Sequence, residues 1–189
     1  MGNFNQALFQ AIYGFARKNF FLDVLGIFLA QYLPYLLVLG FLILVFYYAR
    51  SYKMRFLVFV DGALAVILAR GILTEVIRFF YHHARPFDVF GFTPLVGESG
   101  SSFPSGHAAF LFALALVVFY YNRKMGIWYL VLALVNGLAR VYTGVHWPMD
   151  ILGGAIIGLA SGFFTHWLVK PIFEKLSAAE PRGADPLGK

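Results

Sequence analysis

The sequence contains no cysteine and few charged residues. The absence of cysteine excludes disulfide bonds, thiolate metal sites and a cysteine nucleophile. Charged residues make up 13% of the 189 positions, against about 25% in typical soluble domains. Hydrophobic residues instead make up 60%, and the mean hydropathy is +0.74. A soluble domain of this length cannot bury so much apolar surface, so the composition predicts a membrane protein.

Long apolar segments predict an all-α, polytopic membrane helical bundle. A helix needs roughly 20 apolar residues to cross a bilayer. About five segments approach this length, at residues 22–48, 56–80, 105–121, 126–145 and 149–169. Charged residues inside these segments are costly unless they face the bundle interior, so we interpret Asp61 and Arg70 as partners in structural ion pairs.

The two ends of the chain differ from this central part. Phe4, Leu8 and Phe15 belong to an apolar stripe at helical spacing, which predicts an amphipathic helix within residues 1–19. That helix either lies on the membrane surface or packs as a core helix. We expect residues 1–176 to form a single membrane-embedded domain, and residues 177–189 to be a flexible polar tail.

Basic residues indicate the orientation of the bundle. The net charge of +6 comes from residues that flank apolar segments and form no basic face, so nucleic acid is not an expected partner. By the positive-inside rule, the side whose short loops carry most of the basic residues is cytoplasmic. These loops and the tail carry Arg50, Lys53, Arg55, Arg123, Lys124, Lys170, Lys175, Arg182 and Lys189. Three tryptophans near the predicted span ends fit an interfacial aromatic belt, namely Trp128, Trp147 and Trp167.

One small-residue stripe bears on assembly. Gly154, Gly158 and Gly162 recur on one face of the last predicted span. Small residues let helices approach closely. The stripe fits packing within the bundle, which we favour, or a contact face in a homo-oligomer.

The first polar cluster is RFFYHHARPF, residues 78–87. A helix through this stretch would place Arg78 and Arg85 two turns apart on one face, together with Glu75 and His82, until Pro86 ends it. Two guanidinium groups suit an oxyanion with several oxygens. Taken alone, the arginines are better explained by contact with lipid headgroups at the interface.

The second cluster is FPSGHAAF, residues 103–110. Pro104 cannot continue a helix backwards and Ser105 is a good N-cap, so a helix is expected to begin here. The free amides and the dipole at a helix start favour an anion. Gly106 allows close approach to the backbone, and His107 falls in the first turn.

The third cluster is ARVYTGVHWPMDILGG, residues 139–154. Pro148 suits the first position of a helix, which places Asp150 in its first turn, within reach of His146. A carboxylate on one imidazole nitrogen fixes the tautomer and makes the other nitrogen more basic. Arg140 lies near the end of the preceding span.

The predicted topology brings all three clusters to one side of the membrane. Three arginines and a helix start favour an anion, while two histidines supply a nucleophile and an acid. These are the groups needed for phosphoryl transfer. No carboxylate cluster suited to magnesium is apparent beside them, so no metal or other cofactor is expected.

The three clusters resemble the type-2 phosphatidic acid phosphatase superfamily, whose pattern is Lys-x6-Arg-Pro, Pro-Ser-Gly-His and Ser-Arg-x5-His-x3-Asp. The resemblance covers residues 78–150 in the correct order. Arg78 stands where the family usually has lysine, and Ala139 where it usually has serine.

The resemblance implies a role for each matching residue. His146 attacks phosphorus to form a phosphohistidine, Asp150 orients His146, and His107 protonates the leaving oxygen. The phosphoryl oxygens are held by Arg78, Arg85, Ser105, the Gly106 amide and Arg140.

The resemblance also implies an integral membrane lipid phosphatase. It looks most like the bacterial undecaprenyl-diphosphate phosphatases, with an active site that faces the periplasm or cell exterior from the cytoplasmic membrane. Phosphatidylglycerophosphate, phosphatidate and lipid A phosphatases are the alternatives. A non-enzymatic anion transporter or lipid-binding membrane protein is an alternative of another class. The expected partners are a lipid phosphate substrate and membrane lipids.

Overall fold

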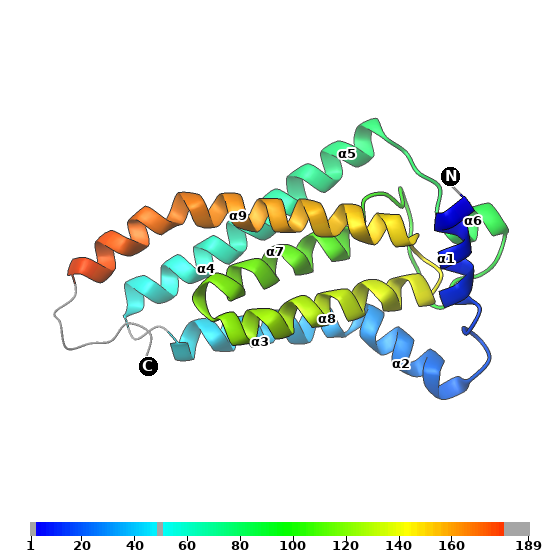
Figure 1. Cartoon of the computed structure of the whole chain (residues 1–189), viewed down its shortest axis with the longest axis horizontal. Coiled ribbons are helices and arrows are strands. Elements are labelled where there is room, and N and C mark those ends of the chain that lie inside the picture. Colours follow the sequence, from blue (N-terminus) through cyan, green and yellow to red (C-terminus); the bar gives the residue numbers. More distant parts are fainter. Residues whose placement is uncertain (1–2, 49–50, 180–189) are drawn as a thin grey trace.

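The computed structural model describes residues 3–48 and 51–179, and every regular element in this part of the chain is a helix. The predicted all-α fold is confirmed. The helices pack side by side into an elongated bundle (Figure 1). They are α1 (Asn3–Tyr13), α2 (Phe20–Gln31), α3 (Leu33–Tyr48), α4 (Tyr52–Val66), η1 (Ile67–Leu73), α5 (Thr74–Phe80), α6 (Pro86–Phe90), α7 (Gly106–Tyr121), α8 (Arg123–Tyr142) and α9 (Pro148–Ala179).

Three helical segments in the described residues are long and apolar enough to cross a membrane. They are Tyr52–Phe80, which joins α4, the π-helical turn η1 and α5, then Arg123–Tyr142 and Pro148–Leu176. The predicted span 22–48 is instead two helices, α2 and α3, which meet at a bend of 46° and could together make a fourth span. Pro34 lies in the first turn of α3, where its missing N–H is tolerated, and favours a new helix start there.

The predicted span 105–121 is α7, an apolar helix of only 16 residues. It packs against α4, α8 and α9, and lies in the middle of the bundle in Figure 1. Gly154, Gly158 and Gly162 face it: a Cβ at these positions would meet the backbone oxygens of Ser105, Ala109 and Ala113. The interpretation of this stripe as packing within the bundle is therefore confirmed.

Two charged residues within the long Tyr52–Phe80 segment, Asp61 and Arg70, have partners. Asp61 is fully buried and accepts a hydrogen bond from Tyr121 Oη at 3.0 Å, and it pairs with His166 Nδ1 at 2.9 Å. Arg70 pairs with Glu75. Both residues pair with neighbours as expected, Arg70 in an ion pair with Glu75 and Asp61 with Tyr121 and His166.

Helix α1 has two different faces. Phe9 is fully buried against Trp147, with ring centroids 5.1 Å apart, and Asn5 is buried as well. Phe4 and Leu8 on its other face are exposed, as is Phe15 in the turn that follows the helix. The helix therefore has a packed inner face, whereas contact of its exposed apolar face with a membrane surface stays a prediction.

Two further expectations, the tryptophan belt and the boundary of the C-terminal tail, differ from the structure. Trp128 and Trp167 are exposed as a belt requires, but Trp147 is fully buried, and its indole Nε1 donates to Ala84 O at 3.0 Å. It belongs to the protein interior. Helix α9 extends to Ala179, past the predicted end of the domain at 176, and residues 180–189 of the predicted tail lie outside the described residues.

The three polar clusters meet at one end of the bundle. In Figure 1, α1 and α6 cap the end where α5 and α8 finish and where α7 and α9 begin. The connection between α7 and α8 and the last turns of α9 lie at the opposite end, with several of the basic residues, namely Arg123, Lys124, Lys170 and Lys175.

Candidate active site

The third cluster forms the floor of the site. Helix α8 ends at Tyr142, and Gly144 follows with φ of +85°, a left-handed conformation that glycine adopts without strain. The chain then runs through His146 and Trp147 to Pro148, the first residue of α9. This tight return places Asp150 in the first turn of α9, facing back to His146, as the sequence predicts.

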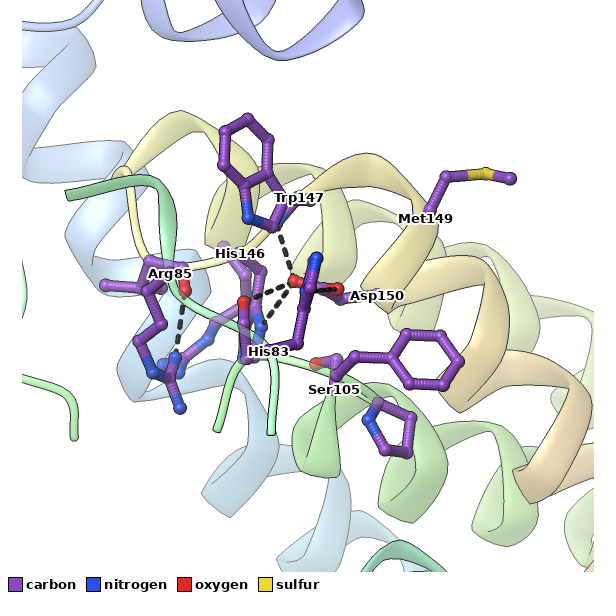
Figure 2. Close-up of polar contacts among 12 residues, drawn as sticks. His83, Arg85, Ser105, His146, Trp147, Met149 and Asp150 are labelled. Carbon is purple, nitrogen blue, oxygen red and sulfur yellow. Dashed lines mark hydrogen bonds and ion pairs between the residues drawn. The ribbon is translucent and has the colours of Figure 1, made fainter. Parts of the chain in front are cut away.

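The buried carboxylate of Asp150 connects the residues of the third cluster to the loop before α7. Its Oδ2 accepts a hydrogen bond from the backbone N–H of Trp147 at 2.8 Å and another from Ser102 Oγ, and lies 3.3 Å from His146 Nδ1. Its Oδ1 lies 3.5 Å from His83 Nδ1. Figure 2 shows His146, Trp147 and His83 grouped around this carboxylate. The contact through Nδ1 leaves Nε2 as the nitrogen with a lone pair for chemistry.

His146 is neutral in this environment. Burial lowers the pKa of His146 to about 4; the hydrogen bond with Asp150 opposes this shift, and the nearby charge of Arg140 adds to it. A neutral imidazole is nucleophilic, whereas a protonated one is not. The surroundings therefore keep His146 in its reactive form at neutral pH.

The second cluster begins α7 as predicted. Ser105 is fully buried and caps the helix: its Oγ accepts from Ala108 N at 3.4 Å, while its own N–H donates to Asp150 O at 3.0 Å. The space above Gly106 is taken by the side chain of Arg70. The half-buried His107 lies in the first turn and lines a cavity of about 210 Å³ together with Arg70.

Arg78 and Arg140 have donors that protein groups do not use. Arg78 Nη2 donates to Pro104 O at 3.0 Å, and Arg140 pairs with Glu98. The Nε atoms of both are buried without a hydrogen-bond partner. Buried donors are nearly always satisfied in folded proteins, so these two guanidinium nitrogens have the capacity to bind the oxygens of a ligand.

Arg85 is placed differently from the prediction. Helix α5 ends at Phe80, and residues 81–85 are extended because they bond to the loop before α7: Ser102 N donates to His83 O at 2.7 Å, and His83 N to Ser101 Oγ at 3.1 Å. Arg78 and Arg85 therefore share no helical face, and His82 is exposed. The prediction of one helical stripe is wrong.

The guanidinium of Arg85 mainly binds backbone. It donates to the carbonyl oxygens of Ser99, Gly100, Ser101 and Val145, at 2.8 to 3.2 Å. These bonds use four of its five donors. Burial lowers the pKa of Arg85 to about 10, with Glu98 opposing, so it stays protonated. Arg85 thus ties the loop before α7 to the residue preceding His146.

Four residues at the site were not singled out as site residues from the sequence: Ser102, His83, Glu98 and Trp147. His83 sits two positions from Arg85, and Ser102 precedes the Pro-Ser-Gly-His stretch, so both lie in segments that the sequence marks. Their contacts with Asp150, however, join residues 48 or more positions apart, which no local pattern reveals.

The fold and this site define a membrane phosphatase of the type expected from the sequence. Residues 59–174 match the PAP2 superfamily, and the chain belongs to this family.

Among its relatives is the bacitracin transport permease protein BcrC of Bacillus licheniformis. It is 31% identical over 161 residues, which cover 84% of this chain and 77% of that protein. The undecaprenyl-diphosphatase BcrC of Bacillus subtilis (strain 168) is 28% identical over 84% of this chain and 81% of its own length. The crystal structure of Aquifex aeolicus LpxE has a TM-score of 0.71 and 27% identity, and the match covers 87% of this chain and 95% of that chain.

Proposed function

We propose that this protein is a lipid phosphatase that hydrolyses undecaprenyl diphosphate to undecaprenyl phosphate and phosphate through a phosphohistidine. One observation carries the proposal. Arg78 interacts electrostatically with Asp150, and Arg140 with His146, across the buried His146–Asp150 pair, and both arginines have a buried Nε without a hydrogen-bond partner. A neutral nucleophile next to unsatisfied cationic donors is suited to attack on a phosphoryl group.

The proposed reaction has two steps. His146 Nε2 attacks phosphorus, the bond to the leaving oxygen breaks, and His107 gives that oxygen a proton. Because burial lowers the pKa of His107 to about 3, His107 must take up this proton when the anionic phosphate binds. Water then attacks the phosphohistidine, gives a proton to His107 and releases phosphate, which restores His146. Arg78, Arg140 and the amides at the start of α7 hold the phosphoryl oxygens, and Asp150 keeps His146 in the reactive tautomer.

The cavity beside His107 supports a lipid substrate. It is lined by Pro34, Val38 and Phe110 in addition to Arg70 and His107, so an apolar wall adjoins the site. Pro34 and Val38 come from α3, close to its bend with α2, and Phe110 comes from α7. An isoprenoid or acyl chain could lie along it while the phosphate reaches the arginines. The name of the Bacillus subtilis relative favours the diphosphate of undecaprenol among such lipids.

A panel of substrates tests the proposal. Purified protein in detergent is given undecaprenyl diphosphate, phosphatidate, phosphatidylglycerophosphate and lipid A, and released phosphate is measured with and without EDTA. We expect the fastest release from undecaprenyl diphosphate, unchanged by EDTA. Faster turnover of another lipid would reassign the substrate, and activity that needs added magnesium would refute the metal-free mechanism.

A second candidate function is a transporter or anion-binding protein, because one relative bears the name transport permease. The arginines would serve this function too, but turnover would not depend on His146. A protein that binds phosphate yet releases none from any lipid of the panel would favour this alternative.

We also propose that the site faces away from the cytoplasm. Basic residues concentrate at the opposite end of the bundle, which the positive-inside rule assigns to the cytoplasm. The chain has no cysteine, so Gly97→Cys and Arg123→Cys give two single-cysteine proteins. Both positions are exposed. An impermeant maleimide should label position 97 and not position 123 in intact cells, and the reverse pattern would invert the orientation.

A further inference from the structure

Glu98 contacts two buried arginines of the site. It lies in the loop between α6 and α7, where its carboxylate pairs with Arg140 and lies 3.7 Å from Arg85 Nη2. The side chains of Arg85 and Arg140 are 1% and 2% exposed, and that of Glu98 is 26% exposed. A partly accessible carboxylate therefore covers two cations that have almost no contact with solvent.

This pairing has a clear electrostatic reason. Two buried guanidinium groups without an anion carry a large desolvation cost and repel each other. Burial acts to raise the pKa of Glu98, but the charge and hydrogen bond of Arg140, with the charge of Arg85, lower it overall. The carboxylate is therefore ionised at neutral pH and neutralises the site when no substrate is bound.

A carboxylate and a phosphoryl group compete for the same donors. Both present oxygen acceptors that guanidinium groups bind in the same way. Arg140 has an unpartnered Nε and an Nη2 that bonds to Glu98. The Glu98 carboxylate therefore competes with a phosphoryl group for Nη2 of Arg140.

The loop around Glu98 allows this replacement. Gly97 precedes it in open surroundings, while Arg85 fixes the backbone that follows through the carbonyls of Ser99, Gly100 and Ser101. Asp150 contrasts with this, because it is fully buried on α9 and hydrogen-bonded to Ser102 and Trp147. Glu98 can turn away from Arg140, whereas Asp150 is fixed in place.

We propose that Glu98 occupies the phosphate position of the empty site and is displaced by the phosphoryl group of the substrate. This inference rests on the proposed lipid phosphatase function. Displacement weakens the binding of every phosphate, but a lipid phosphate regains affinity from its chain in the apolar cavity. Free phosphate has no such compensation, so Glu98 makes the site release its product and select lipid-linked phosphates.

The test measures binding of inorganic phosphate to the full-length protein in detergent by titration calorimetry. Glu98→Gln keeps the shape of the side chain and removes its charge. We expect phosphate to bind this variant roughly tenfold or more tightly than the wild type. We also expect KM for the lipid phosphate and Ki for phosphate to fall, and kcat to fall because product release becomes slow.

Three control variants separate the effect of Glu98 on phosphate binding from a change in net charge and from loss of folding. Glu174→Gln removes an exposed charge on α9 that pairs with Lys170, and it should leave phosphate binding unchanged. Glu98→Asp shortens the side chain and should restore the weak binding in part. Glu98→Ser is a second neutral variant for the case that Glu98→Gln unfolds.

The outcomes are distinct for the inference and for the function. Phosphate binding that is unchanged or weaker in both neutral variants would overturn the inference, because Glu98 would then support the arginines and not compete with phosphate. Tighter phosphate binding without turnover of any lipid phosphate would uphold displacement by phosphate and refute the phosphatase function.

Discussion

Two buried aspartate–histidine pairs lie in this molecule, in different surroundings. Asp150 pairs with His146 at 3.3 Å and Asp61 pairs with His166 at 2.9 Å, through Nδ1 in both cases. Both carboxylates are fully buried. By the geometry of the pair alone, the second is as good a candidate for a catalytic group as the first.

The neighbours of the two pairs differ. Arg140 and Arg85 act on His146, beside the start of α7. Asp61 accepts from Tyr121, and the ring of His166 stacks on Tyr120 with centroids 3.9 Å apart. Aromatic rings enclose one pair, while cationic donors with free capacity surround the other. We infer that an anion site depends on such donors, and that the Asp61–His166 pair ties α4 and α9 together.

The largest effect is expected from removal of each histidine. His146→Ala should lower turnover of the lipid phosphate by on the order of 10⁵-fold or more, because the nucleophile is lost. His166→Ala should keep the turnover of correctly folded protein. Phosphate release per folded molecule, with folding checked by gel filtration, makes the comparison. Near-normal turnover in His146→Ala would rule out the phosphohistidine mechanism.

Asp150→Asn should have the next largest effect. The amide keeps the shape of the side chain but changes its hydrogen bond with His146, and the loss could reach on the order of 10⁴-fold by analogy with the carboxylate of a catalytic triad. The reduction should appear in kcat for both lipid and aryl phosphates. A loss confined to KM would mean that Asp150 acts in binding.

Asp61→Ala should lower stability without affecting chemistry. It leaves Tyr121 and His166 without their acceptor, which should cost on the order of 1–3 kcal/mol. Thermal unfolding in detergent should show a lower midpoint, while kcat below that temperature stays near the wild-type value. A large loss of kcat in folded protein would mean that the two pairs are coupled along the bundle.

The smallest effect concerns pH. Since burial lowers the pKa of His146 to about 4, its neutral form should persist well below the ordinary value near 6.5. The acid limb of kcat/KM should therefore lie near pH 4 once the titration of the substrate is corrected by phosphorus NMR. The same shift stabilises the fold above pH 6.5, and this contribution is lost as pH falls from 6.5 towards 4. An acid limb at 6.5 would contradict the burial of His146.

The sequence by itself determined the helical fold class, the approximate positions of most spans and the three segments that build the site. These features depend on hydropathy and on capping groups close to each other in the chain, such as Ser105 at the start of α7 and Pro148 at the start of α9. The pairing of His146 with Asp150 was also predictable, because they lie four positions apart and Asp150 falls in the first turn of the helix that begins at Pro148.

Only the tertiary structure decided where the donors of Arg85 point, which groups surround Asp150 and what covers Arg140. Local periodicity extended the helix through residue 85, but backbone bonds to Ser101 and Ser102 end it at Phe80. Glu98 reaches Arg140 across 42 positions of sequence. Such contacts form because a buried charge or donor takes the nearest partner in space, and the sequence alone does not fix which partner that is.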